Sequence, residues 1–302
     1  MGKPGPKVVL VVGSGRSGTS WLGQMVQAAG PYISVFEPLH PSHVPDAVPL
    51  WGRYLRPDNS YPPFERFFDR LVGGGGLTRW SDQENPGAGS RFHPAPWARR
   101  LLRPPRVIKM IRANLMFGWL RQRYHLPAVY VVRHPAATIA SWLKLGWGGR
   151  LSHFSGQSDL LADHLAGRDV RWQTTDPVEA LATRWAIENL VPVSQMRYQG
   201  WTVATYEELL ADPRREVTRV LRELGLPFTQ QVAVAIGRPS ISTHGHSTTG
   251  PVAQRLSRWQ TELTRGQIST ILGIAQDFDL GLYGEDPTPV GSLRRWTQDG
   301  EW

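Results

Sequence analysis

A glycine-rich loop that follows an apolar run, VVLVVGSGRSGTSW at residues 8–21, most constrains what this chain can fold into. The continuous β-branched run before the loop is typical of a parallel strand that is covered on both faces. Residues 19–30 are expected to form a helix that ends at Gly30. This unit presents backbone N–H groups and the positive end of a helix to an anion. It therefore predicts a phosphate site, and an ordinary tight strand-to-helix turn is the simpler alternative.

Strand and helix patterns alternate along the rest of the chain. Further strands are expected at 32–36, 106–111, 128–132 and 201–206, and helices at 114–124, 136–145, 177–198 and 213–224. This alternation predicts a three-layer α/β fold with a P-loop-like, mostly parallel sheet flanked by helices.

Two stretches rich in Pro, Gly, Trp and His do not fit this alternation, namely 38–105 and 146–176. Long irregular inserts in an α/β protein are usually lids or binding loops, so we expect them to be candidate acceptor loops. Tolerated surface insertions are the alternative. The organisation expected is a single domain over 1–284 and a flexible tail over 285–302.

The formal net charge of +9 suits an anionic ligand, an acidic substrate or nucleic acid. Only four of the 34 basic residues are lysines, so a lysine within an apolar strand draws attention. The chain has no cysteine, which excludes disulfides and thiolate metal sites. The apolar run near the N-terminus is too short for a signal peptide or a membrane span. We expect a cytoplasmic protein without a membrane span.

The loop departs from the phosphate-binding pattern G-x-x-x-x-G-K-[ST] at one position. Thr19 stands where the pattern requires lysine, and the nearest cation is Arg16. In nucleotide triphosphatases that lysine reaches the β- and γ-phosphates, and a strand-end acid helps to hold magnesium. Glu37 is the only acid that ends a predicted strand. The loop therefore favours a ligand with a 5′-phosphate but no triphosphate, and no metal requirement is expected.

A second candidate phosphate site lies in the sequence VYVVRHPAATIASWL. A strand is expected to deliver Arg133 at its end, Pro135 to open a helix, and Ser141 to lie one to two turns into that helix. Arginine and serine can hold a phosphate together. The spacing alone is common, but after a phosphate loop it predicts two phosphate sites on one ligand.

Together these segments resemble the sulfotransferases that use 3′-phosphoadenosine-5′-phosphosulfate (PAPS). GRSGTSW resembles the 5′-phosphosulfate loop of that family, and VVRHPAATIAS resembles its 3′-phosphate element. TYEELLADPRREVTRVLRELGLP at 205–227 resembles the Tyr-Glu-x-Leu segment with its helix. RLSRWQTEL and LGLYG resemble the C-terminal region. The resemblance extends discontinuously from residue 8 to about 284 and does not include the inserts.

The resemblance implies roles for residues that would bind the donor. The 5′-phosphosulfate would be held by Arg16, Ser17, Gly18, Thr19 and Ser20, with Trp21 beside the adenine. The 3′-phosphate would be held by Arg133 and Ser141. Tyr206 matches a tyrosine near the adenine, with a core tyrosine as the alternative. Arg255 is either a further 3′-phosphate ligand or a solvated helix arginine.

The resemblance indicates the catalytic residues less directly than the donor-binding residues. Lys109 matches the lysine of a strand-end Lys-Thr-His element, but Ile111 stands where that element has its histidine. VFEPLH instead resembles the Phe-Glu-Pro element of carbohydrate sulfotransferases, which makes Glu37 the expected base. A loop-capping role for Glu37 is the alternative, and His40 is the second candidate base. His134 is expected to pack near the phosphate.

The acceptor is predicted only as a small molecule or glycan with a hydroxyl group, such as a sugar, lipid or secondary metabolite. Five insert tryptophans could form an aromatic floor for it or could cap the core: Trp51, Trp80, Trp97, Trp147 and Trp172. Two other functions stay open. A P-loop kinase of a small molecule would need the missing lysine and magnesium, and a nucleic-acid-binding protein would need a basic run interleaved with aromatic residues. The oligomeric state is not predicted.

Overall fold

The computed structural model describes residues 5–85, 102–196, 201–240 and 250–291. Its centre is a five-stranded sheet in the order β2-β3-β1-β4-β5, and every neighbouring pair is parallel. The strands are β1 (Val8–Gly13), β2 (Ile33–Phe36), β3 (Arg106–Met110), β4 (Ala128–Val132) and β5 (Thr202–Thr205). The α/β class and the parallel sheet are confirmed.

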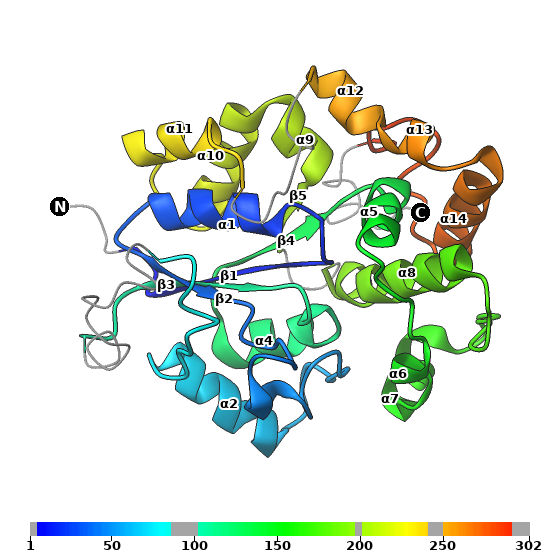
Figure 1. The fold of residues 1–302 in the computed structure, drawn as a ribbon. Coiled ribbons are helices and arrows are strands. Elements are labelled where there is room, and N and C mark those ends of the chain that lie inside the picture. The colour runs from blue at the N-terminus through cyan, green and yellow to red at the C-terminus, as the bar shows by residue number, and fades with distance from the viewer. Residues whose placement is uncertain (1–4, 86–101, 197–200, 241–249, 292–302) are drawn as a thin grey trace.

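The strands are buried on both faces, as their apolar runs predict. Val9 and Val11 of β1 belong to one core, and Val8, Leu10 and Val12 belong to the other. The first core is covered by α1 (Thr19–Ala28), α10 (Pro213–Glu223) and α11 (Gln230–Ile236). Figure 1 shows these helices on one side of the sheet and α2 (Pro62–Val72) and α4 (Phe117–Tyr124) on the other. The sheet is therefore the middle of three layers.

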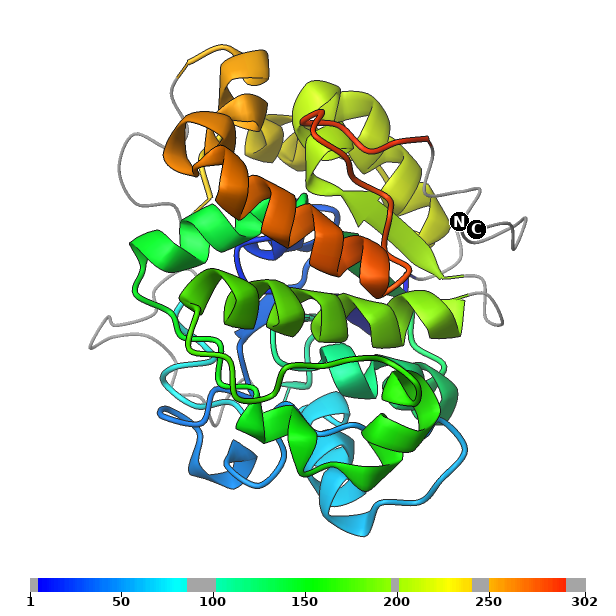
Figure 2. The ribbon, with the colours of Figure 1, turned by 90° about the vertical axis from the view of Figure 1, so that its right-hand side faces the viewer.

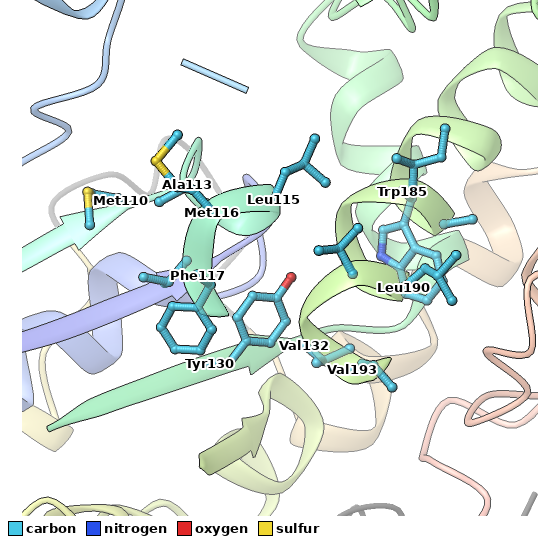
Figure 3. Packing of buried hydrophobic residues seen from close by; sticks show 14 of the residues in the cluster. Met110, Ala113, Leu115, Met116, Phe117, Tyr130, Val132, Trp185, Leu190 and Val193 are labelled. Atoms are coloured by element: carbon cyan, nitrogen blue, oxygen red, sulfur yellow. The ribbon is translucent and has the colours of Figure 1, made fainter. Parts of the chain in front are cut away.

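The second core is the larger one and holds several aromatic side chains. Phe117 and Tyr130 lie 5.5 Å apart between their ring centroids, with Met110 nearby (Figure 3). The long helix α8 (Pro177–Met196) closes this core with Trp185 and Leu190. It lies beside α14 (Arg265–Asp277) and α5 (Pro135–Lys144), and Figure 2 shows α8 and α14 side by side.

The two inserts contain regular structure that the sequence did not reveal. The described part of 38–105 includes the turn η1 (Pro45–Ala47) and the helix α2, which buries Phe67, Phe68 and Leu71. The stretch 146–176 includes α6 (Ser152–Ser155), α7 (Ser158–Leu160) and the π-helical segment η3 (Leu161–Leu165). Part of each insert therefore belongs to the core.

The remaining elements follow the sheet strands closely or end the chain. They are η2 (Asn114–Met116), α9 (Tyr206–Ala211), α12 (Val252–Ser257) and α13 (Trp259–Glu262). In the part of the chain that the structure describes, no helix combines the length and apolar character of a membrane span.

The register of the parallel strands collects functional candidates at one edge. Lys109 of β3 stands level with Val11 of β1 and Phe36 of β2. The carboxyl ends of all five strands face the same edge, because the sheet is parallel throughout. The glycine-rich loop, Glu37, Ile111, Arg133 and Tyr206 each come directly after one of these strands. Open α/β sheets bind their ligands at this edge.

Candidate active site

A cavity of about 1050 Å³ opens at the carboxyl edge of the sheet. All but one of the predicted site residues line it. The lining residues among them are Arg16, Gly18, Thr19, Ser20, Trp21, Glu37, His40, Lys109, Arg133, Ser141, Tyr206 and Arg255. Ser17, the exception, is buried beneath the loop, where its hydroxyl oxygen has no hydrogen-bond partner among the described residues.

The glycine-rich loop is a tight turn that leaves the start of α1 open. Ser17 donates its backbone N–H to the Ser14 carbonyl at 3.2 Å, and Arg16 has a positive φ of 68°. Gly18 precedes α1 with φ 94°, and a Cβ atom there would lie 2.6 Å from the Tyr206 ring. No side chain caps the helix, and its first turn holds no acid. Its N–H groups can therefore receive an anion.

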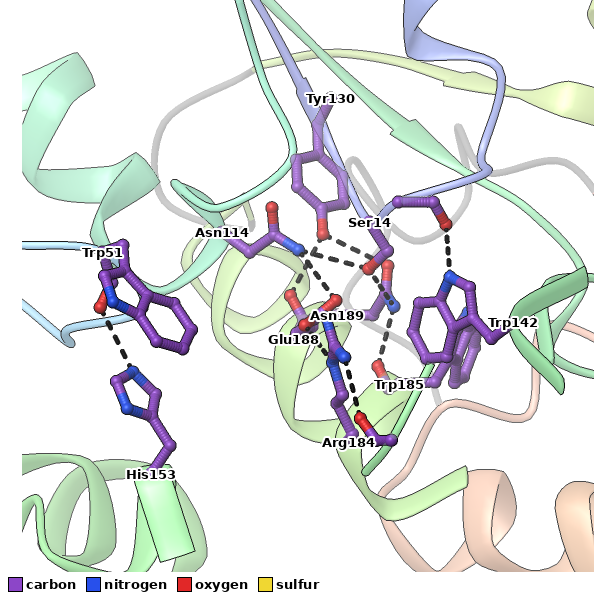
Figure 4. Close-up of polar contacts among 12 residues, drawn as sticks. Ser14, Trp51, Asn114, Tyr130, Trp142, His153, Arg184, Trp185, Glu188 and Asn189 are labelled. Atoms are coloured by element: carbon purple, nitrogen blue, oxygen red, sulfur yellow. Dashed lines mark hydrogen bonds and ion pairs between the residues drawn. The ribbon is translucent and has the colours of Figure 1, made fainter. Parts of the chain in front are cut away.

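A buried polar network holds the loop from below (Figure 4). The Ser14 hydroxyl accepts hydrogen bonds from the Asn114 and Asn189 amides, each at 3.2 Å. The single proton of the Tyr130 hydroxyl has two acceptors in reach, the Glu188 carbonyl at 3.0 Å and Asn189 Oδ1 at 3.2 Å. Four elements are thus tied to one serine: the loop, η2, β4 and α8. The sequence carries no motif for this network, because its members come from distant parts of the chain.

The second predicted phosphate element meets the loop in the same cavity. Arg16 Nε donates to Ser141 Oγ at 3.1 Å, and Arg133 Nη1 donates to the Arg16 carbonyl at 2.8 Å. The Arg133 guanidinium also lies over the Tyr206 ring, 4.4 Å from its centroid. Burial and the neighbouring charge of Arg133 lower the pKa of Arg16. Two neighbouring guanidinium groups beside the open start of α1 suit an anionic ligand.

Glu37 forms the most heavily paired charge cluster in the cavity. Its carboxylate contacts Lys109 Nζ at 2.9 Å through Oε1 and Arg112 Nη1 at 3.2 Å through Oε2. The Ile111 backbone N–H reaches both oxygens, at 3.1 and 3.2 Å. Lys109 also lies 4.1 Å from the centroid of the Phe36 ring. Glu37 is only 2 % exposed, so these contacts replace almost all of its hydration.

His40 lies one turn beyond Glu37 in an aromatic group with Trp80 and His43. Its ring centroid is 4.9 Å from that of Trp80 and 4.5 Å from that of His43. Burial, followed by the charge of Arg112, lowers the pKa of His40 to about 4. His40 is therefore neutral at pH 7, and its Nδ1 has no hydrogen-bond partner among the described residues.

His134 has a structural position rather than one in the cavity lining. Its Nδ1 accepts from the Ala136 backbone N–H at 3.1 Å, so it caps α5. Its Nε2 is 3.0 Å from the Gly284 carbonyl and must carry the proton in that tautomer. The ring stacks on Trp259 with centroids 4.3 Å apart. His134 thus caps α5 next to Arg133 and holds the C-terminal segment, and its packing near the phosphate stays a prediction.

Several cavity cations were not singled out from the sequence. They are Arg112, Lys144, Arg238 and Arg258. Arg112 follows the strand-end lysine by three residues, and this proximity is the only sequence signal for it. Lys144 pairs with Glu262 and so joins α5 to α13. Arg255 lines the cavity, and its buried Nε has no hydrogen-bond partner within the described ranges.

The insert tryptophans divide between the cavity and the core. Trp80 and Trp147 line the cavity. Trp51 instead stacks on His153 with centroids 4.2 Å apart (Figure 4). Trp172 lines a separate shallow hollow with its neighbours in sequence. Trp97 lies outside the described residues.

The described part of the chain contains no cluster of side chains suited to bind a metal ion. Among residues 5–85, 102–196, 201–240 and 250–291, no three His, Asp or Glu side chains come together as metal ligands would.

The chain is similar to one protein family and, at low sequence identity, to solved structures. The model of the sulfotransferase domain family matches residues 6–242. The sulfotransferase domain from the curacin biosynthetic pathway is 14% identical, with 92% of this chain and 98% of that chain covered and a TM-score of 0.49. The sulfotransferase domain from the Synechococcus PCC 7002 olefin synthase is 15% identical, with 92% and 96% covered and a TM-score of 0.46. Among curated proteins, no match is found.

The buried His134 should make stability depend on pH. Burial, followed by the charge of Arg133, lowers its pKa to about 4, whereas an unfolded histidine titrates near 6.5. Below pH ~6.5 the unfolded chain takes up a proton that the native state refuses, so stability falls as the pH drops toward 4. At pH 5 this residue alone should remove about 2 kcal/mol from the free energy of unfolding.

His134→Asn isolates this contribution, because asparagine can still cap α5 but does not titrate. Urea unfolding of both proteins at pH 7.5 and pH 5 measures the effect. The wild type should lose about 2 kcal/mol more than the variant over this range. Equal losses would mean that His134 is not a buried neutral residue. His40 is present in both proteins, so its own titration cancels.

Proposed function

Because the chain belongs to the sulfotransferase domain family, whose members use PAPS as the donor, we propose that it transfers a sulfuryl group from PAPS to a hydroxyl acceptor. The acceptor class proposed is a sugar, a lipid or a secondary metabolite. One observation carries this proposal. A single cavity contains two adjoining anion-binding elements, the loop with Arg16 and the pair Arg133 and Ser141, beside the Glu37–Lys109 ion pair.

The residues at the donor end fit a ligand with two separate phosphates. Two residues of the cavity lining there have a buried nitrogen without a hydrogen-bond partner among the described residues, Arg133 Nε and Arg255 Nε, and Ser17 Oγ in the adjoining loop also lacks one. Buried polar groups are normally satisfied, so these atoms suit a ligand rich in acceptor oxygens. The uncapped start of α1 supplies further N–H donors beside them.

We assign the donor residues as follows. The loop residues and the start of α1 would hold the 5′-phosphosulfate: Ser17, Gly18, Thr19 and Ser20. Arg133, Ser141 and Arg255 would hold the 3′-phosphate, with Trp21 and Tyr206 beside the adenine. Arg16 touches Ser141 and therefore stands between the two phosphate elements. Its charge can act on both.

Bound PAPS supplies the sulfuryl group, whose S–O bond to the 5′-phosphate breaks as a new S–O bond to the acceptor oxygen forms. Lys109 is the cation nearest the base and would neutralise charge on the phosphate that leaves. The acceptor proton would go to the Glu37 carboxylate.

Glu37 suits the role of base because its surroundings keep it fixed and charged. Lys109 and Arg112 contact different oxygens, and the Ile111 N–H shares both. Each oxygen accepts from one cation and from the shared Ile111 N–H, so these contacts use about four acceptor positions. The acceptor hydroxyl would take the place of the shared Ile111 N–H on one of the two oxygens. His40, the alternative base, packs against the rings of Trp80 and His43, but its Nδ1 has no hydrogen-bond partner among the described residues.

Trp80 and Trp147 are the two insert tryptophans that line the cavity. Their flat apolar faces suit a sugar ring or a flat aglycone. We therefore propose that the inserts bind the acceptor, although parts of them also complete the core.

The 3′-phosphate site should discriminate between nucleotides. The protein should bind 3′-phosphoadenosine-5′-phosphate (PAP) much more tightly than AMP. Arg133→Ala should weaken the binding of PAP by about 1.5–3 kcal/mol, since it removes a charge-assisted hydrogen bond. The binding of AMP should change far less. Isothermal titration of both ligands, with ATP as a third, measures this.

Arg66→Ala is the matched control, because Arg66 is exposed and does not line the cavity. Equal wild-type affinities for PAP and AMP would contradict the 3′ assignment. If Arg133→Ala lowered the affinities for PAP and AMP equally, the substitution would have disturbed the glycine-rich loop. A preference for ATP would favour a kinase.

Sulfuryl transfer should need no metal ion, because the proposed machinery neutralises charge with arginine and lysine. Turnover of PAPS to PAP should stay nearly unchanged in excess EDTA. Loss of turnover that magnesium restores would contradict this prediction.

Glu37→Gln tests the base. Glutamine keeps the shape but cannot take the acceptor proton, so turnover should fall on the order of 10²–10⁴-fold. Affinity for PAP should stay within a few-fold. His40→Ala should cost far less. If Glu37→Gln keeps near-full turnover while His40→Ala abolishes it, the histidine is the base. A large loss of PAP affinity in Glu37→Gln would mean that Glu37 mainly positions Lys109.

A further inference from the structure

Arg112 is a half-buried cation that shares its ion-pair partner, Glu37, with Lys109. Its side chain is 21 % exposed and lines the cavity beside Glu37. Glu37 is already paired with Lys109 at the shorter distance of 2.9 Å. Glu188, the other acid whose charge acts on Arg112, is paired with Arg184 at 2.8 Å. Lys109 has a second acid, Glu84, within electrostatic range. Both acids that act on Arg112, in contrast, are shared with another cation.

The hydrogen bonds of Arg112 leave one edge of its guanidinium group open. Nη1 donates to Glu37, while Nε and Nη2 have no hydrogen bond to the described residues. Neither atom is among the buried polar atoms without a partner, so both remain accessible. The same edge of Arg56 binds the Asp163 carboxylate through Nε at 2.7 Å and Nη2 at 2.8 Å. This two-bond geometry is the one that a carboxylate favours.

The surroundings of Arg112 add positive charge rather than remove it. Arg53 and Arg184 both act on the nearby His153 and lower its pKa, after the larger effect of burial. Arg53 is exposed, and the loop that carries it is joined to Arg112 through the Gly52 N–H. The part of the cavity next to Arg112 is distinct from the donor end, which is lined by Arg16, Arg133 and Arg255.

We infer that Arg112 binds a carboxylate of the acceptor, so that the substrate is a hydroxylated carboxylic acid. This inference rests on the proposed function and deepens it. Arg112 contacts the proposed base, so a carboxylate on its open edge would hold the acceptor next to Glu37. When Glu37 takes the acceptor proton and loses its charge, the acceptor carboxylate would keep Arg112 paired. Arg112 is therefore a specificity residue.

The test uses acetate as the probe and protein saturated with PAP, so that the donor phosphate sites are filled. Acetate is titrated against chloride at constant ionic strength, and binding is followed by the fluorescence of the cavity tryptophans. The wild type should bind acetate saturably. Arg112→Gln should weaken the affinity for acetate by about tenfold or more, because it removes both the positive charge and the pair of N–H donors on the open edge. Arg112→Lys should give an intermediate loss, since it keeps the charge alone.

Arg66→Gln is the matched control and should bind acetate as the wild type does. PAP binding, measured first on every variant, shows that each protein is folded. If PAP binds but acetate does not, or if Arg112→Gln binds acetate like the wild type, the inference fails while the proposed function stands. Failure of PAP to bind contradicts the proposed function itself. Inorganic phosphate that binds more tightly than acetate, and depends on Arg112, would overturn the carboxylate assignment.

Discussion

Parallel pairing of the five strands is the constraint on which the candidate site depends. The strands are largely buried, so most of their side chains are committed to packing, and the residues at or just after their carboxyl ends are available for chemistry. The parallel arrangement brings these residues to one edge, although they are far apart in sequence. Glu37 and Lys109 meet because β2 and β3 are neighbours in register. An antiparallel neighbour would have sent one of them to the opposite edge.

The loop above this edge is held by packing and by buried hydrogen bonds together. Ser14 receives two amide donors from below, and Trp142 donates to the Gly15 carbonyl at 2.9 Å. A loop anchored in this way keeps its N–H groups oriented before a ligand arrives. Such preorganisation lowers the entropic cost of binding a ligand. It also lets the N–H groups stabilise negative charge without first having to reorient. The same hydrogen bonds thus stabilise the fold and keep the loop ready to bind a ligand.

The sequence predicted the regular elements that repeat a clear pattern. The strands at 106–111 and 128–132 and the helix at 177–198 match the structure to within a residue or two. The inserts were harder to interpret, because their apolar residues are scattered. Helix α2 buries Phe67, Phe68 and Leu71, but these contacts exist only once the sheet is there to receive them. A pattern search cannot detect a partner that is distant in sequence.

The sequence by itself determined the class of site, because the chemistry of a phosphate loop lies within a few consecutive residues. It also determined the strand-end positions of Glu37, Lys109 and Arg133. Only the tertiary structure decided which of these residues touch. Arg112 joins Glu37, Arg16 reaches Ser141, and His134 turns away from the cavity to cap α5. The physical reason is that ion pairs and buried networks act through space, at a few ångströms, between segments whose separation along the chain carries no signal.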